Sequence, residues 1–279
     1  MTTETAARLV SEPLKPIIGS RVLNSKDELL SGALSAEIRE LLEKRGVLVF
    51  PRVGFTDEEQ IAFTKSLGTF YIERHGHAIH KITLDGTDAE DEYREMLKAT
   101  FQWHFDGFIS PIPVFASLLT PKVLSDTGGQ TQFCSTCAAY DALDDADKAL
   151  IADLRAVHSI AYSWLAVEPQ PSYAAWREWL AIGNKEHPLV WKHQSGRKSL
   201  VIGGTAFYIV GMDPVESKSL LIRLRDFATQ PQFVYSHEWE MGDLVMWDNT
   251  GTLHRAIPYD PKSGRLLHRT KIAGHEPIA

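Results

Sequence analysis

The chain has 279 residues and a formal net charge of −7, with 44% hydrophobic and 23% charged residues. This composition is ordinary for a globular protein, and the acidic charge argues against a nucleic-acid or anionic-membrane partner. No apolar run approaches the roughly 18 residues that a transmembrane helix needs, and the length fits one domain over residues 1–279.

The first 15 residues lack the basic segment and apolar core of a secretory signal, so they predict a flexible arm on a cytoplasmic protein. Cys134 and Cys137 lie in FCSTC without a second cysteine pair or a matching Cys/His set. A redox pair or a zinc half-site is therefore less favoured than two small buried thiols.

The first part of the chain alternates helices and a strand. SAEIRELLEKR predicts an amphipathic helix that ends at Gly46, and the strand VLVF follows. TDEEQIAFTKSLG opens with Thr56 and Glu59 at the spacing of a capping box and ends at Gly68, which predicts another helix. The acidic, glycine-bearing LDGTDAEDEYRE predicts a mobile surface loop.

From residue 101 onward, strands separated by turns dominate. PVFASLLTPKV, GGQTQF and GRLLHRTKIAG predict strands, and LVWKHQSGRKSLVIGG and QFVYSHEWEMGDLVMWDN predict hairpins. Helices are predicted over DDADKALIADLRAVHS and over DPVESKSLLIRLRDFAT, where Pro214 occupies the first turn. The pattern indicates a mainly β fold with added helices, a β-barrel or jelly roll.

Residues 160–187 differ from this pattern because they hold three of the seven tryptophans. We expect this segment to be an insertion that forms a lid or a pocket wall, or a helix that packs its tryptophans onto the barrel.

FQWHFDGFIS places His104 and Asp106 two residues apart among aromatic side chains. On a strand these two side chains point to the same face. They could be two of the three ligands of an Fe(II) site of the 2-His-1-carboxylate type, or simply a hydrogen-bonded His–Asp pair.

A third ligand and two cations follow late in the chain. His254 comes after the predicted strand DLVMWDN, and Arg265 and Arg269 are four residues apart on the final predicted strand. Two arginines on one face of a barrel strand indicate that anions bind there, because a guanidinium suits a carboxylate and is seldom buried alone.

Together these residues resemble the taurine/2,4-dichlorophenoxyacetate dioxygenase (TauD/TfdA) family of Fe(II)- and 2-oxoglutarate-dependent oxygenases. The resemblance runs from EIRELLEKRGVLVFPR to KIAG, and GGQTQFCSTCAAYDAL, SGRKSLVIG, ATQPQFVYSHEWEMGDLVMWDN and LHRA are similar to the phenoxyacetate dioxygenase branch. It implies a double-stranded β-helix, which is a cupin-like jelly roll, and an enzyme that uses Fe(II), 2-oxoglutarate and O2.

The resemblance also implies roles for individual residues. His104, Asp106 and His254 are expected to bind the iron, and Thr131 and Arg265 to bind 2-oxoglutarate. Substrate contacts are expected from a set of one cation and four aromatic residues, namely Arg269, Phe105, Phe108, Tyr162 and Trp164. Asp248 is expected to hold a metal ligand or Arg265 by a hydrogen bond.

Two features depart from the family pattern. Family members commonly have arginine after WDN, where this chain has Thr250, and Phe105, Gly107 and Phe108 replace the short polar residues of the herbicide-cleaving enzymes. The first departure removes a charge near the third ligand, and the second indicates a differently shaped substrate pocket.

The expected reaction is hydroxylation of a small hydrophobic organic anion, with a carboxylate favoured, or ether cleavage through hydroxylation, with release of succinate and CO2. The alternatives are a sulfonate- or sulfate ester-cleaving dioxygenase of the same family, a zinc hydrolase, and a non-catalytic β-barrel anion-binding protein. The resemblance also implies a homo-oligomer.

Overall fold

The computed structural model describes residues 8–72, 76–85 and 95–279. Its largest sheet has the strand order β1-β2-β3-β14-β6-β16-β4, with β5 also paired to β16, and is antiparallel except at the β2–β3 pair. Its strands are β1 (Ser11–Pro13), β2 (Ser20–Val22), β3 (Val47–Phe50), β4 (Phe70–Tyr71), β5 (His80–Thr83), β6 (Ala116–Val123), β14 (Leu244–Asp248) and β16 (Leu266–Ile272).

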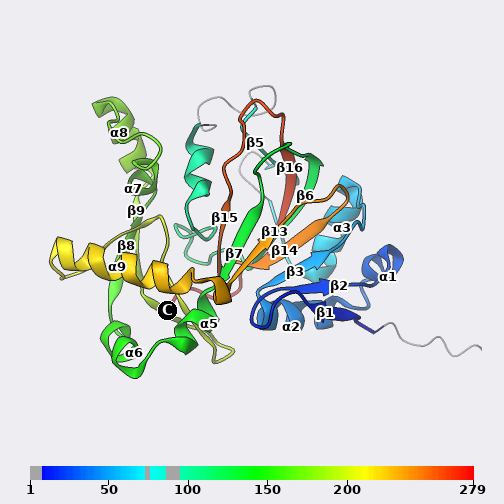
Figure 1. The fold of residues 1–279 in the computed structure, drawn as a ribbon, viewed down its shortest axis with the longest axis horizontal. Coiled ribbons are helices and arrows are strands. Elements are labelled where there is room, and N and C mark those ends of the chain that lie inside the picture. Colours follow the sequence, from blue (N-terminus) through cyan, green and yellow to red (C-terminus); the bar gives the residue numbers. More distant parts are fainter. Residues whose placement is uncertain (1–7, 73–75, 86–94) are drawn as a thin grey trace, which may run out of the picture.

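A smaller sheet, ordered β13-β7-β15, lies against the large one (Figure 1). It consists of β13 (Val234–His237), β7 (Thr131–Ser135) and β15 (Thr252–Ala256), all antiparallel. Buried side chains from both sheets, among them Phe133, Trp247 and Leu267, form one cluster between them. Two facing antiparallel sheets confirm the predicted jelly-roll core.

Three helices cover the outer face of the large sheet, on the right in Figure 1. They are α1 (Lys26–Leu30), α2 (Ser35–Arg45) and α3 (Asp57–Leu67). The capping box of α3 forms as predicted, with Thr56 accepting from the Glu59 amide and the Glu59 side chain accepting from the Thr56 amide. Their apolar sides pack on β3, β6 and β14 in a second buried cluster.

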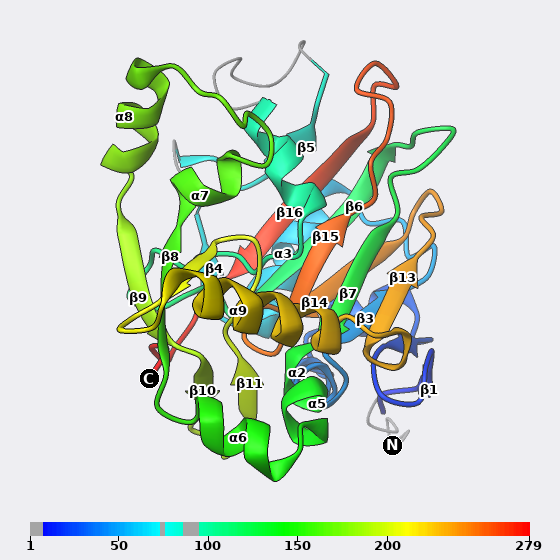
Figure 2. The ribbon, with the colours of Figure 1, turned by 60° about the vertical axis from the view of Figure 1, so that its left-hand side comes forward.

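The remaining elements pack beyond the small sheet. The helices are η2 (Glu95–Phe101), α5 (Thr136–Ala142), α6 (Asp145–Ile151), α7 (Ile160–Trp164), α8 (Tyr173–Ala181), α9 (Pro214–Ala228) and η3 (Pro231–Phe233). The strands are β8 (Arg155–Ser159), β9 (Asn184–Pro188) and β12 (Ala206–Ile209) in one sheet and β10 (Val190–Lys192) and β11 (Lys198–Leu200) in another. In Figure 2, α9 crosses in front of the small sheet.

Two predicted elements were wrong in part. The helix predicted over residues 144–159 ends at Ile151, and Arg155–Ser159 form β8, whose Ala156, Val157 and His158 are buried between two neighbouring strands. The predicted hairpin over residues 232–249 does not form, because β13 pairs with β7 while β14 pairs with β3 and β6. The turn at Gly242 therefore carries the chain from one sheet to the other.

Two predicted segments can be compared with the structure. Residues 11–13 of the expected arm form β1 and pair with β2, which corrects that part of the prediction, and residues 1–7 lie outside the described residues. Much of the predicted acidic loop, residues 86–94, lies outside them as well. Within the described residues, no helix is long and apolar enough to cross a membrane.

Gln60 ties α3 to the large sheet and is fully buried. Its side-chain amide donates to the His268 carbonyl and to the Thr270 hydroxyl, both at 3.2 Å, and its oxygen accepts from Thr120 at 2.7 Å. A buried polar group that loses such partners costs roughly 1–3 kcal/mol.

We therefore expect Gln60→Leu to lower the free energy of unfolding by about 2–4 kcal/mol, since it leaves Thr120 and Thr270 without this partner. Urea denaturation followed by circular dichroism measures the change. Gln232→Leu, at an exposed glutamine, is the matched control. Equal stability of the two variants would show that the Gln60 hydrogen bonds do not hold α3 in place.

Candidate metal centre and substrate pocket

Two histidines far apart in the sequence are brought together by backbone pairing. His104 and His254 form an isolated antiparallel bridge, in which the His104 amide donates to the His254 carbonyl at 3.0 Å and the reverse bond is 2.8 Å. Their ring centroids are 4.2 Å apart. His104 thus extends the small sheet beside β15, which places both imidazoles on its inner face.

Asp106 follows His104 in a turn rather than on a continuous strand, so the predicted strand geometry of the HxD pair was wrong. Its carboxylate is nevertheless directed to the histidines, because Ser117 of β6 donates to its Oδ2 at 3.2 Å. Asn249 reinforces this arrangement by donating to the Ser117 hydroxyl at 2.9 Å.

His104, Asp106 and His254 each offer a ligand atom within 4.8 Å of the others. The carbonyl of Gln102 lies 2.9 Å from His104 Nδ1, which leaves Nε2 of that ring available as a donor atom. The distance from Asp106 Oδ1 to His254 Nε2 is 4.0 Å, too long for a hydrogen bond but suited to a shared ion.

Electrostatics favours the protonation states that metal binding needs. Burial lowers the pKa of His104, and burial together with the neighbouring His104 holds that of His254 well below its ordinary value. Burial alone would raise the pKa of Asp106, but Lys271 and Arg269 outweigh it and hold this pKa well below its usual range. Two neutral imidazoles and one carboxylate are a donor set that suits Fe(II).

Arg265 is buried close to the start of β7. Its Nη2 donates to the Gly129 carbonyl at 2.8 Å, and its guanidinium lies 4.5 Å from the ring centroid of Tyr259. A Cβ at Gly129, where φ is +79°, would lie 2.8 Å from Arg265 Nε. Glycine is needed there for both the backbone conformation and the close approach.

Thr131 lies two residues after Gly129 and pairs with Ala256 of β15. Since Phe133 pairs with His254, Thr131 and His254 point to the same inner face of the small sheet. Its buried hydroxyl accepts a hydrogen bond from Trp239 at 3.1 Å. Thr131 and Arg265 therefore lie near each other on the same side of the site as His254.

Two cations reach Asp106 from β16. Arg269 donates to Asp106 Oδ2 at 3.2 Å, and the Lys271 ammonium is 3.6 Å from the same oxygen. Lys271 has no predicted role, but its position two residues after Arg269 on a strand, and hence on the same face, could have indicated one.

An apolar pocket of about 310 Å³ opens beside His104 and Asp106. Phe105, Phe108 and Trp164, three of the residues expected to contact the substrate, line this pocket. The elements η2 and α7 add mainly apolar side chains, namely Met96, Leu97, Ala99 and Ile160. Tyr162 does not line this pocket. It lines a second cavity, which Gln102 also lines, and this corrects its expected place in the substrate pocket. Residues 160–164 thus form a pocket wall, and α8 packs Trp179 onto Trp164.

Asp248 does not hold a metal ligand or Arg265. Its two carboxylate oxygens accept from Arg197 at 2.6 Å and from Thr250, whose amide and hydroxyl lie at 2.8 and 2.6 Å. Arg197, from the turn between β10 and β11, also contacts the Thr250 hydroxyl. Arg197 therefore places a guanidinium beside Thr250 and Asp248.

Comparisons with known proteins agree with this geometry. Residues 11–271 match the model of the family described as "Taurine catabolism dioxygenase TauD, TfdA family". The chain is 36% identical to an (S)-phenoxypropionate/alpha-ketoglutarate-dioxygenase of Sphingobium herbicidovorans, over 94% of each chain. It is also 36% identical to an alpha-ketoglutarate-dependent 2,4-dichlorophenoxyacetate dioxygenase of a Burkholderia species, over 95% of this chain and 94% of that one.

Among solved structures, AAD-2 in complex with Mn(II) and N-oxalylglycine superposes with a TM-score of 0.83 at 33% identity, covering 98% of this chain and 100% of that one. An alpha-ketoglutarate-dependent sulfate ester dioxygenase of Pseudomonas putida is less similar, at 27% identity over 99% of this chain and 93% of that protein. With the His-Asp-His site in place, the chain belongs to the TauD/TfdA family and is an enzyme, a dioxygenase that uses Fe(II), 2-oxoglutarate and O2.

Proposed function

We propose that this dioxygenase hydroxylates a small hydrophobic carboxylate, and that it cleaves an aryl ether when the hydroxylated carbon adjoins the ether oxygen. The observation that carries the proposal is the apolar pocket that ends at His104 and Asp106, together with the two cations, Arg269 and Lys271, that contact the Asp106 carboxylate from β16. An apolar wall with a few convergent charges is the usual makeup of a site for a small organic anion.

In this proposal His104, Asp106 and His254 hold Fe(II), and the Thr131 hydroxyl and Arg265 hold the carboxylates of 2-oxoglutarate. When bound, the iron and the cosubstrate supply the oxidation, in which O2 and 2-oxoglutarate yield succinate, CO2 and one oxygen atom for the substrate C–H bond. Arg265 suits a carboxylate because it is 3% exposed and its fork is held by Gly129 and Tyr259.

The substrate anion is assigned to Arg269, with Lys271 beside it. Leu267 packs between the two sheets, so Arg269 and Lys271, two and four residues later on β16, also face the interior. Phe105, Phe108 and Trp164 enclose the hydrophobic body of the substrate and exclude water from the reacting carbon.

The alternatives have weaker support. The relative that acts on sulfate esters is less similar than the phenoxyalkanoate dioxygenases. A zinc hydrolase or a non-catalytic binding protein conflicts with membership of a dioxygenase family and with a complete His-Asp-His site.

We also propose a cytoplasmic homo-oligomer that binds neither nucleic acid nor membrane. The net charge of −7 and two free cysteines are consistent with this setting. Light scattering coupled to size-exclusion chromatography tests the oligomeric state, and a monomer at all concentrations would contradict it.

The central experiment reconstitutes the protein with Fe(II) and 2-oxoglutarate without oxygen, then adds O2 and one compound from a panel. The panel contains aryloxyalkanoates, aryl and alkyl carboxylates, sulfonates and sulfate esters. We expect succinate formation to be stimulated most by the aryloxyalkanoates, with release of the corresponding phenol. Stimulation by sulfate esters alone would overturn the substrate class but not the reaction class.

The lowered pKa values of both histidines predict how metal binding depends on pH. Two ordinary imidazoles would lose about 100-fold in metal affinity between pH 7.5 and pH 5.5, because both become protonated near 6.5. Since burial lowers both pKa values here, protons compete only at lower pH, and we expect a much smaller loss. Calorimetric titration with Mn(II) measures it, and a full 100-fold loss would contradict the burial argument.

Gly129→Ala tests the assignment of Arg265 to 2-oxoglutarate. The added Cβ displaces the Arg265 guanidinium. We therefore expect the Kd for 2-oxoglutarate to rise by about tenfold or more, which corresponds to the loss of one charged hydrogen bond. Mn(II) binding should be unchanged. The control is Gly183→Ala, since Gly183 also has a positive φ but nothing lies within 4 Å of its Cβ position. If both variants bind 2-oxoglutarate equally, Arg265 does not anchor it.

Arg269→Gln tests the substrate anchor. We expect the KM for a carboxylate substrate to rise by about 10- to 100-fold, with a much smaller change for its neutral amide analogue, because only the former loses an ion pair. Because Arg269 also contacts the proposed metal ligand Asp106, the Mn(II) affinity of the variant is measured as a control for damage to the metal site. Equal effects on acid and amide would place the substrate anion elsewhere.

A further inference from the structure

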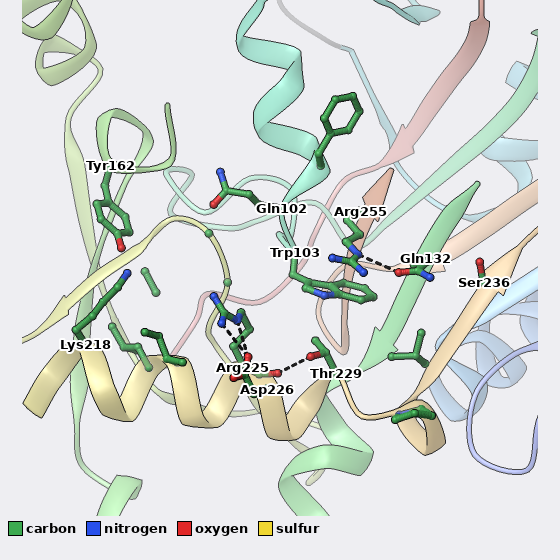
Figure 3. Close-up of a pocket in the computed structure, with 18 of the residues that line it drawn as sticks. Gln102, Trp103, Gln132, Tyr162, Lys218, Arg225, Asp226, Thr229, Ser236 and Arg255 are labelled. Carbon is green, nitrogen blue, oxygen red and sulfur yellow. Dashed lines mark hydrogen bonds and ion pairs between the residues drawn. The ribbon is translucent and has the colours of Figure 1, made fainter. Parts of the chain in front are cut away.

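A second cavity, of about 700 Å³, lies on the outer face of the small sheet (Figure 3). Side chains alternate along a strand, so Arg255 points outward where His254 points inward, and Gln132 points outward where Thr131 points inward. Arg255 and Gln132 form one wall together with Ser236 of β13, and α9 forms the opposite wall. None of the assigned roles in oxidation uses this cavity.

Positive charge is concentrated among the lining residues. Lys15, Lys218, Arg225 and Arg255 line the cavity with a single carboxylate, Asp226, although the whole chain carries a net charge of −7. Asp226 is engaged by its neighbour Arg225 at 2.8 Å. Across the described ranges 8–72, 76–85 and 95–279, no ion pair joins a carboxylate to the other three cations.

The cations are close enough to repel one another. Burial lowers the pKa of Lys218, and the Arg225 charge lowers it further. Burial also lowers the pKa of Arg255, and Arg225 again adds to this effect. Arg225 is therefore repelled by Lys218 on its own helix and by Arg255 on the opposite wall. An anion bound between the two walls would offset this repulsion.

Other contacts fix these cations in position. Arg255 lies over the Trp103 ring, 4.6 Å from its centroid, and donates to Gln132 at 2.9 Å. Lys218 lies 4.6 Å from the ring centroid of Tyr162. Lys15 donates to the carbonyls of Pro231 and Val234 at 3.1 and 2.7 Å. A charged group held in this way loses little conformational freedom on binding a ligand.

We propose that this cavity binds a small organic molecule that carries at least two negative charges, at a site separate from those of 2-oxoglutarate and the substrate. One anionic group contacts Lys218 and Arg225 on α9, and the other contacts Arg255 on β15. Gln132 and Ser236 supply further polar contacts, and the volume admits a ligand of small-molecule size.

The site shares a wall with the iron-side pocket, because Gly204 lines both cavities. The Gly204 amide donates to the Trp103 carbonyl at 2.7 Å, and the Gln102 carbonyl is the partner of His104 Nδ1. The Gln102 side chain, which lines the second cavity, donates to the Ser163 carbonyl at 2.9 Å. A ligand here thus lies directly behind the segment that positions His104.

The test uses the protein loaded with Mn(II) and 2-oxoglutarate, and benzene-1,3-disulfonate as the probe, since sulfonates coordinate metals weakly. Calorimetric titration at constant ionic strength compares this dianion with the monoanion benzenesulfonate. We expect the dianion to bind at least about tenfold more tightly, because two charged groups are satisfied rather than one. Equal affinity, or no binding of the dianion, would overturn the proposal.

Variants locate the probe. In the double variant Lys218→Met, Arg225→Gln we expect the affinity for the disulfonate to fall by about tenfold or more. The control is Arg223→Gln on the same helix, which removes one charge but lies outside the cavity and pairs with Asp147. Unchanged affinity in the double variant, or a loss confined to Arg269→Gln, would place the probe elsewhere and overturn the proposal.

Discussion

The buried carboxylate of Asp106 is the constraint on which the rest of the site depends. A carboxylate removed from water is costly unless charges and hydrogen bonds compensate for it. Here Ser117 of β6 and the two cations of β16 provide this compensation, and all of them act on Oδ2. Oδ1 is thereby directed toward the histidines, so the large sheet fixes the anionic ligand while the small sheet fixes the two neutral ones.

The jelly roll makes this convergence possible. His104 and His254 are 150 positions apart, yet two backbone hydrogen bonds set their rings side by side, so their position does not depend on flexible side chains alone. Because β7 and β15 have two faces, the same strands direct Thr131 and His254 inward and Gln132 and Arg255 outward. The outer cavity and the oxidation site are therefore built on opposite faces of the same two strands.

Local sequence predicted most of the elements but not all of their pairing. Capping residues, periodicity and turn glycines located α2, α3, α9 and the β10–β11 hairpin, because these signals act over a few residues. The path of the chain through Gly242 was missed, since whether two strands pair depends on the other strands available to each. The strand β8 was missed because its short run of buried residues follows α6 closely and was interpreted as the continuation of that helix.

The site shows the same division. The spacing of His104 and Asp106, the late His254 and the family resemblance indicated the ligands, but no local pattern connects Arg197 to Asp248, 51 residues away. Tyr162 and Trp164 are two residues apart and were assigned together, yet on the short helix α7 they point to different cavities. On a helix, residues two apart lie on different faces, so an aromatic cluster in the sequence does not become one pocket wall.

Charge balance connects the metal to the substrate class. Lys271 and Arg269 hold the pKa of Asp106 well below its usual range, so this carboxylate stays ionised as a metal ligand. They lie 3.6 and 3.2 Å from the same carboxylate oxygen, Oδ2. An anionic group on the substrate would gain a further favourable interaction with these two cations, whereas a neutral group would not. The residues that keep the carboxylate ligand ionised are therefore the same ones that we propose to attract the substrate anion.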